Sequence, residues 1–331
     1  MRAVQLVRPA PIETAPLGAT ERAVPEPAAG EVLVRVAACG VCRTDLHVVE
    51  GELPLVRSPI VPGHQVVGRV ERVGQDVSGP RAGDRVGIAW LRWTDATCGY
   101  CRTGRENLCE RARFTGYHAD GGYAEYAVAP ADYVYPIPDR FDDVEAAPLL
   151  CAGIIGYRAL LRSRVATGQR LLMYGFGSSA HVTLQVAVAR GIEVYVCTRE
   201  PAARALACTL GAVWAGAPAD RPPAPADGAI VFAPVGELVP VALRNLAPGG
   251  TLALAGIYMT PIPTMEYADL FRERTITSVT ANTRDDGRAL LGEAARIGIR
   301  PAVTTFPLAQ ANVALRQLKA GAFAGSGVLV V

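Results

Sequence analysis

The stretch Arg170-Leu-Leu-Met-Tyr-Gly-Phe-Gly-Ser-Ser-Ala180 decides the fold of the second half of this chain. A short, mostly apolar run is followed by two closely spaced glycines and an apolar segment, an order that predicts a buried strand, a tight turn and a helix. The glycines let N–H groups at the helix N-terminus approach a pyrophosphate, and alanine is tolerated at the third position of such a motif. The turn therefore indicates a dinucleotide site, the alternative being a turn that only packs strand on helix. The expected binding residues are Gly175, Gly177, Ser178, Ser179 and Ala180.

The residues after the next expected strand, 193–197, bear on which dinucleotide binds. An NAD site usually offers a carboxylate to the ribose 2′-hydroxyl here, but this chain has Thr198, and Arg199 beside it could pair with a 2′-phosphate. The sequence therefore favours NADP over NAD. Two other interpretations stay open: Arg199 is a solvated loop residue, or Glu200 supplies the carboxylate.

The pattern of the chain divides it into two parts. From about residue 143, apolar helical stretches alternate with strands expected at 170–174, 193–197, 228–232 and 251–255, which is typical of a parallel α/β sheet. Residues 217–227, with four prolines, are expected to form a surface loop. The earlier part carries short alternating runs at 31–37, 65–71 and 123–128, which predict a compact β-rich domain. The tail is expected to add a helix at 310–319 and a strand near Val328 that could return to the first domain.

Length and charge exclude several classes of protein. The 331 residues are enough for two domains with sizeable cores. The 33 Lys and Arg residues against 31 Asp and Glu give a net charge of +2, which argues against nucleic-acid and membrane-surface partners and favours small molecules. The charged N-terminus is unlike a secretion signal and no stretch is typical of a membrane span, so we expect a cytoplasmic protein.

One group of candidate metal ligands lies mainly in the first part of the chain. Cys42 opens the motif Cys-Arg-Thr-Asp-Leu-His47, His64 follows it, and Cys151 lies far downstream. Two thiolates and one imidazole would leave the fourth position of a tetrahedral zinc open for water or substrate, as in catalytic sites. Taken singly, each of these residues could equally be part of the core.

A second group is contained in a short cysteine-rich stretch. Three thiolates and a carboxylate could close a structural zinc site, although by spacing alone a partial zinc ribbon or a redox pair stays open. The candidate ligands are Asp95, Cys98, Cys101 and Cys109. The remaining cysteines, Cys39, Cys197 and Cys208, are expected to be packing residues.

This order of motifs resembles the zinc-dependent alcohol dehydrogenases of the medium-chain dehydrogenase/reductase superfamily over essentially the whole chain. The stretch Gly63-His-Gln-x-x-Gly68-x5-Gly74-x-x-Val77 follows the zinc signature of that family at every spacing. The resemblance implies an α/β fold of two domains. Residues 1–150 and 284–331 would form a GroES-like β-rich catalytic domain with a zinc lobe at about 90–112, and residues 151–283 a Rossmann domain with a doubly wound parallel sheet.

The resemblance also implies roles for the residues of the first metal group and its surroundings. Cys42, His64 and Cys151 would hold the catalytic zinc, and Asp45 would orient His64. The second group would hold a structural zinc.

Further roles follow from the same resemblance. Thr44 would hydrogen-bond the substrate alcohol, and His47 would pass its proton towards solvent through the cofactor ribose. Arg43 would touch the pyrophosphate, and Gly256 and Ile257 would line the dinucleotide.

Two departures from the family pattern concern the metal sites. Gln65 stands where the signature usually has Glu, which removes a negative charge close to the zinc. Asp95 replaces the first of four lobe cysteines and supplies a harder oxygen ligand that binds zinc more weakly than thiolate in a soft site. By resemblance, Trp90, Leu91 and Leu53 would line a modest apolar substrate pocket.

The sequence therefore predicts a zinc- and NAD(P)-dependent alcohol dehydrogenase acting on a small alcohol or aldehyde. By resemblance to bacterial relatives it would be a homo-oligomer, a dimer or a tetramer. One alternative is a quinone or enone reductase of the same superfamily, but those lack the zinc ligands found here. The other is a catalytically silent, zinc-stabilised dinucleotide sensor, against which the presence of both Thr44 and His47 argues.

Overall fold

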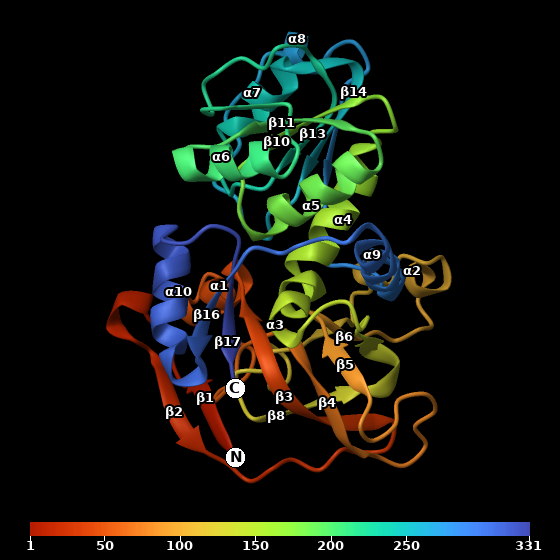
Figure 1. Cartoon of the computed structure of the whole chain (residues 1–331), viewed down its shortest axis with the longest axis vertical. Coiled ribbons are helices and arrows are strands. Elements are labelled where there is room, and N and C mark those ends of the chain that lie inside the picture. Colours follow the sequence, from red (N-terminus) through yellow and green to blue (C-terminus); the bar gives the residue numbers. More distant parts are fainter. The chain divides into compact units, whose positions relative to one another are not determined.

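The computed structural model describes residues 1–331, which form two compact units. Unit 1 comprises Met1–Cys151, Ala281–Ala295 and Pro301–Val331, and unit 2 comprises Ala152–Thr280 and Arg296–Arg300. Figure 1 shows the course of the chain, with the N-terminal strands in red and the C-terminal strands and helix in blue.

Unit 1 is built mainly of antiparallel strands. Its largest sheet has the order β16-β17-β3-β4-β5-β9, with β8 also paired to β3. The last strand, β17, runs antiparallel to β3, so the expected return of the C-terminal strand to the N-terminal part is confirmed (Figure 1). The elements are β1 (Arg2–Leu6), η1 (Ile12–Thr14), β2 (Leu17–Glu21), β3 (Glu31–Val41), α1 (Arg43–Glu50), β4 (Gln65–Val73), β5 (Arg85–Ile88), β6 (Leu91–Trp93), α2 (Gly99–Arg102), η2 (Glu106–Leu108), β7 (Arg113–Phe114), β8 (Tyr126–Pro130), η3 (Ala131–Tyr133), β9 (Val134–Pro136), α3 (Asp143–Ala146), η4 (Ala147–Leu150), β16 (Val303–Pro307), η5 (Leu308–Gln310), α10 (Ala311–Ala320) and β17 (Ser326–Val330), with most of α9 (Arg284–Ile297).

Unit 2 is a six-stranded sheet in which every pairing is parallel. Its order, β12-β11-β10-β13-β14-β15, is the 3-2-1-4-5-6 order of a doubly wound dinucleotide-binding sheet. The fold class expected for this part is therefore confirmed. The elements are α4 (Ala152–Ser163), β10 (Arg170–Tyr174), α5 (Ser178–Ala189), β11 (Glu193–Cys197), α6 (Pro201–Thr209), β12 (Trp214–Gly216), β13 (Ala226–Val231), α7 (Leu238–Arg244), β14 (Leu246–Leu254), α8 (Tyr267–Leu270) and β15 (Thr275–Ser278).

Two of the four strands expected in unit 2 have the predicted bounds, whereas β13 (226–231) was expected at 228–232 and β14 (246–254) at 251–255. Strands β10 and β11 have the predicted bounds, because their apolar runs are buried on both faces of a parallel sheet. The surface loop expected at 217–227 is wrong at its last two residues. Ala226 is fully buried and pairs with Leu246, so β13 begins there. The loop therefore ends at Pro225, and the buried strand begins at the next residue.

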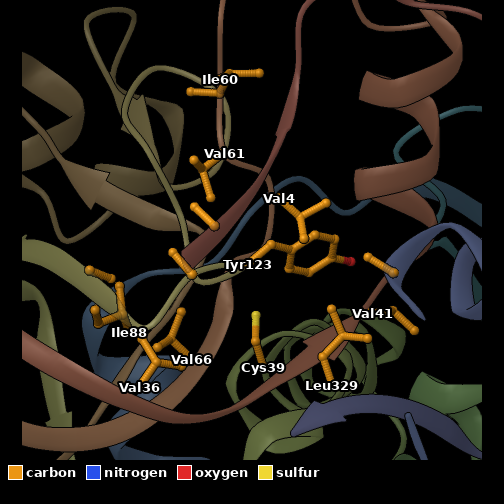
Figure 2. Close-up of a cluster of buried hydrophobic side chains, with 14 of the residues drawn as sticks. Val4, Val36, Cys39, Val41, Ile60, Val61, Val66, Ile88, Tyr123 and Leu329 are labelled. Atoms are coloured by element: carbon orange, nitrogen blue, oxygen red, sulfur yellow. The ribbon is translucent and has the colours of Figure 1, made fainter. Parts of the chain in front are cut away.

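Each unit has its own hydrophobic core. In unit 1, valines of β3 and β4 pack with residues of β1, β17 and the segment before β4 around the fully buried ring of Tyr123 (Figure 2). In unit 2, one core cluster lies between the sheet and helix α7, and apolar residues of α5 are also fully buried. Cys39 and Cys197 are buried in these cores, as expected, but Cys208 is exposed, which corrects the expectation that it packs.

No single helix is both long and apolar enough to cross a membrane. One bent pair of helices, Asp143–Leu150 with Ala152–Ser163, meets the length and composition test only when the two are joined.

Candidate metal and dinucleotide sites

The sheet of unit 1 brings Cys42 and His64 together. Gly40 near the end of β3 pairs with Gln65 at the start of β4 in an antiparallel register, so the residues just beyond these strand ends become neighbours. Cys42 is the N-cap of α1, with an extended backbone. Its N–H donates to Asp45 Oδ2 at 2.9 Å, and its sulfur accepts from the N–H of Thr44 at 3.5 Å. A capping box therefore fixes Cys42 and Asp45 together.

Cys151 completes the first group of ligand atoms. Its sulfur lies 3.9 Å from Cys42 Sγ and 3.2 Å from His64 Nε2, and all three ligand atoms lie within 4.8 Å of one another. Tetrahedral zinc, with bonds of about 2.3 Å to sulfur and about 2.0 Å to nitrogen, would place two sulfur atoms about 3.8 Å apart and a sulfur and a nitrogen atom about 3.5 Å apart. The three side chains therefore fit one zinc ion and leave its fourth position to another ligand.

Asp45 organises the side of this cluster away from the sulfur atoms. Its Oδ1 accepts from His64 Nδ1 at 2.8 Å and from the N–H of Gly63 at 3.3 Å. Its Oδ2 accepts from the N–H of Cys42 and from the Tyr123 hydroxyl at 3.2 Å. Because a carboxylate only accepts, Nδ1 of His64 carries the proton and Nε2 faces the sulfur atoms.

Tyr123 is a site residue that the sequence analysis missed. Its ring is fully buried and its hydroxyl reaches Asp45 from a position 78 residues along the chain. The run around it indicated only a strand, and β8 begins later, at Tyr126. The Tyr123 ring also packs closely on the backbone of Gly63, where a Cβ would lie 2.4 Å from the ring. No pattern of neighbouring residues in the sequence indicates this contact.

Charges inside the cluster shift the pKa values of its members. Burial by itself would lower the pKa of His64, but the charge and hydrogen bond of Asp45 raise it to about 10. The hydrogen bond from Cys151 and the neighbouring His64 hold the pKa of Cys42 well below its usual range. Burial raises the pKa of Cys39, which favours the thiol form of this core residue.

Aromatic rings line one side of His64. The Trp90 ring meets the imidazole edge-on, with centroids 4.9 Å apart, and stacks on Phe114 at 4.8 Å and on Tyr117 at 6.0 Å. Trp90 therefore lies next to the candidate metal group, where a pocket residue was expected. Leu91, by contrast, is fully buried on β6, so the expectation that it lines a pocket is wrong.

Helix α1 presents the remaining expected residues of this region. Thr44 and His47, three residues apart, lie on one face of the helix and are both buried. Arg43 is exposed at the start of the helix. His47 Nδ1 is hydrogen-bonded to the carboxylate of Glu52, a second residue that the sequence analysis missed.

The second candidate metal group is brought together within the stretch 95–109. One ligand atom from each of Asp95, Cys98, Cys101 and Cys109 lies within 4.8 Å of the others. Asp95 Oδ1 accepts from the N–H groups of Cys98 at 2.9 Å and Thr97 at 3.0 Å, and these bonds lower the Asp95 pKa to about 2. The carboxylate is therefore ionised at neutral pH and contacts the thiols of Cys98 and Cys101.

The expected dinucleotide residues lie at the carboxyl edge of the sheet in unit 2. Strands β10, β11, β13 and β14 are parallel, so the loops that follow them meet at one edge, with the strand order reversing between β10 and β13. Gly177 is the N-cap of α5, and no side chain caps this helix. A Cβ on Gly177 would point into open space. The N–H groups at the start of α5 are thus arranged as in an anion site.

The loop after β11 carries the residues that bear on the cofactor. Thr198 is buried and its N–H donates to Gly216 O at 2.9 Å, whereas Arg199 and Glu200 are exposed. Arg204 donates to the carbonyl groups of Thr198 and Arg199 at 2.8 Å each. A second guanidinium group, not anticipated from the sequence, therefore lies against this loop.

After β14 the chain continues to Gly256 and Ile257 at the same edge, and Ile257 is 49% exposed. The structure thus brings the expected dinucleotide residues of unit 2 to one edge of one sheet, whereas Arg43 lies on α1 of unit 1. It also brings each set of expected metal ligands into one cluster.

Among the known proteins that this chain resembles in sequence and in structure are alcohol dehydrogenases. Residues 28–139 match the alcohol dehydrogenase GroES-like domain family. The chain is 54% identical over 337 residues to a probable alcohol dehydrogenase of Mycobacterium tuberculosis (strain CDC 1551 / Oshkosh), covering 100% of this chain and 97% of the relative. It is 39% identical over 309 residues to an alcohol dehydrogenase of Geobacillus stearothermophilus, covering 91% of each. A solved cobalt- and zinc-bound thermostable alcohol dehydrogenase from Pyrobaculum aerophilum is 27% identical with a TM-score of 0.92, covering 100% of this chain and 99% of that one. The likeness extends along the whole chain.

Proposed function

The chain belongs to the zinc-dependent alcohol dehydrogenase family of the medium-chain dehydrogenase/reductase superfamily, and from this premise we propose that it transfers hydride between a small alcohol and NAD(P). The product of oxidation would be an aldehyde or a ketone. The observation that carries the proposal is the cluster of Cys42, His64 and Cys151, whose ligand atoms fit a three-ligand zinc with an open position.

The residues around this cluster support a catalytic rather than a structural metal. Cys42, His64 and Cys151 would hold the ion, which when bound would act as a Lewis acid on the alcohol oxygen. Asp45 fixes the imidazole of His64 through Nδ1 and keeps Nε2 turned towards the thiolates. A buried hydroxyl, that of Thr44, and a buried imidazole, that of His47, follow on one face of α1. Thr44 would orient the alcohol, and His47 would accept its proton.

The edge of the sheet in unit 2 supports dinucleotide binding. The uncapped start of α5 and the open space at Gly177 would receive a pyrophosphate, and Ser178, Ser179 and Ala180 supply the first N–H groups of the helix. We place NADP ahead of NAD because Arg199 is exposed at the loop after β11 and Arg204 lies against the same loop. A guanidinium group pairs well with a phosphate, whereas Thr198 cannot accept two hydrogen bonds from a ribose diol as a carboxylate does.

The cluster of Asp95, Cys98, Cys101 and Cys109 supports a second, structural zinc. Four ligand atoms close a tetrahedral site without an open position. The low pKa of Asp95 keeps its carboxylate ionised, as a ligand must be.

Metal analysis combined with turnover tests the proposal. The wild-type protein is expected to contain two zinc ions per chain and to reduce NADP in the presence of small primary or secondary alcohols. Cys42→Ser should lose one zinc and its turnover, while Cys208→Ser, a matched change at an exposed cysteine, should keep both. Unchanged activity of Cys42→Ser would refute the assignment, and tight cofactor binding without turnover in the wild type would favour a dinucleotide sensor.

A further inference from the structure

The end of helix α1 folds back on the helix itself. Gly51, in the left-handed conformation with φ of 83°, ends the helix, and its N–H donates to Val48 O at 3.3 Å. Two residues later the N–H of Leu53 donates to His47 O at 3.1 Å. Because Gly51 reverses the chain, the residue between them, Glu52, is returned to the last turn of the helix.

This reversal places the Glu52 carboxylate against the ring of His47. The carboxylate is hydrogen-bonded to Nδ1 of the imidazole. The His47 side chain is 8% exposed and that of Glu52 is 42% exposed, so the pair runs from the interior of unit 1 to its surface. An ionised carboxylate only accepts hydrogen bonds, so Nδ1 carries the proton and Nε2 is the ring nitrogen with the lone pair.

The other carboxylate at this helix end is engaged elsewhere. Glu50 Oε1 accepts from the N–H of Ile12 at 2.9 Å and from Lys319 Nζ at 2.8 Å. Glu50 therefore anchors α1 to η1 and α10, whereas Glu52 contacts the imidazole. Glu50, two residues from Glu52 but without a contact to His47 in these hydrogen bonds, is therefore a suitable control position for substitutions of Glu52.

We propose that Glu52 is a positioning residue of the alcohol dehydrogenase reaction, which holds His47 in the Nδ1–H tautomer and in a fixed orientation so that Nε2 can accept the alcohol proton. This proposal rests on the proposed function. In the oxidation direction the alcohol O–H bond breaks, intervening hydroxyl groups relay the proton, and an Nε2–H bond forms while Nδ1–H stays bonded to the carboxylate. The proton then passes to solvent water, which restores the neutral ring. Without the carboxylate the ring could rotate or change tautomer, and Nε2 would often be protonated when an alcohol arrives.

The tautomer can be measured without any substrate. The chain has four histidines, so ¹⁵N-histidine labelling and long-range ¹H–¹⁵N NMR of the zinc protein can resolve each ring, with His47→Gln assigning the signal. Wild type should show a protonated Nδ1 and an unprotonated Nε2 for His47. Glu52→Gln should give a mixture of tautomers, because the amide can donate to Nδ1 as well as accept from it, and Glu50→Gln should leave the signal unchanged. Identical His47 spectra in wild type and Glu52→Gln would overturn the proposal.

Kinetics then test whether the contact serves the reaction. At saturating dinucleotide, Glu52→Gln should lower kcat for alcohol oxidation about 10-fold, as loss of a partner that orients a functional imidazole commonly does. Glu52→Asp should recover part of that loss and Glu50→Gln should show little change. In a His47→Gln background, Glu52→Gln should cause no further loss, because its effect passes through the imidazole.

If adding Glu52→Gln to His47→Gln lowers kcat by a further factor of about 10, Glu52 does not act through the imidazole. That result would overturn the positioning role and indicate a merely structural one. The failure of the proposed function is distinguishable from this. A wild-type protein without alcohol turnover refutes the proposed function and with it the catalytic part of the inference, whereas the NMR comparison of Glu52→Gln with Glu50→Gln still decides whether Glu52 sets the tautomer of His47.

Discussion

Replacing Tyr123 by Phe removes one hydroxyl from the surroundings of the candidate catalytic metal and leaves the ring in place. Asp45 is 2% exposed and accepts four hydrogen bonds, of which the Tyr123 hydroxyl supplies one. Tyr123 is fully buried, so water cannot readily take the place of the lost donor. A hydrogen bond to a charged group contributes about 1.5–3 kcal/mol. We therefore expect Tyr123→Phe to lower the free energy of unfolding by about that amount, or about 10- to 100-fold in the equilibrium constant.

The matched control is Tyr135→Phe. Tyr135 is equally buried, at 1% exposed, and its hydroxyl makes no hydrogen bond of ordinary geometry, although Asn282 lies close to it. Removal of a buried hydroxyl without a good partner should change stability by no more than about 0.5 kcal/mol, or stabilise slightly. The pair of variants therefore separates the hydrogen bond to Asp45 from the general effect of a Tyr-to-Phe change in this core.

Urea unfolding followed by tryptophan fluorescence measures the difference, first with the metal removed by a chelator and then with saturating zinc. A second measurement is zinc affinity by competition with a chromogenic chelator. Tyr123→Phe should weaken binding about 10-fold, because partners beyond the direct ligands commonly contribute that much. Equal stability losses in the two variants, or unchanged zinc affinity in Tyr123→Phe, would refute the argument that Tyr123 supports the metal group through Asp45.

Three further predictions concern other parts of the chain. Asp95→Ala should lose one metal ion per chain and lower the melting temperature more than the initial rate; full zinc content with an unmoved melting curve would remove Asp95 from the ligands. Arg199→Ala should weaken NADP binding about 10- to 100-fold, the value of a charge-assisted pair, while calorimetry shows NAD binding nearly unchanged; a higher kcat/KM of the wild type for NAD than for NADP would contradict this. Lys319→Met should lower the free energy of unfolding by about 0.5–1 kcal/mol near pH 7, because the hydrogen bonds to Glu50 and Glu13 raise the pKa of the ammonium group. That contribution is fully present below the unfolded pKa of about 10.4 and is lost as pH rises through the folded value, so the variant and wild type should converge in strongly alkaline urea titrations; a constant difference would argue against the ion pairs.

The sequence by itself determined the features that depend on neighbouring residues. The run 170–180 specified strand, turn and helix, because a buried parallel strand is continuously apolar and the glycines mark the turn. The motif that begins at Cys42 was recognised for its candidate ligands, and the structure adds that Cys42 and Asp45, three residues apart, cap α1. The cluster of Asp95 and its three cysteines also lies within one short stretch, so its members were identified from spacing.

The tertiary structure alone decided what surrounds these residues. Cys42 and His64 meet because β3 pairs with β4 in a register interrupted by two irregularities, and such a register cannot be derived from the two strand patterns. Cys151, 109 residues from Cys42, was a candidate ligand by residue type, and only the family resemblance implied that it meets Cys42 and His64 at one zinc. Tyr123 reaches Asp45 through packing of the core, which leaves no periodic trace in the sequence.

Glu52 is the instructive intermediate case, because it is only five residues from His47 and was still missed. On helical spacing, residue 52 would lie away from the ring of His47. The left-handed turn at Gly51 returns it instead, and a glycine permits that turn without requiring it. Local sequence thus determined which conformations the chain could adopt near its functional residues. Burial of the β-rich core selected among them, because contacts between distant segments hold the chain in the conformation where these side chains meet.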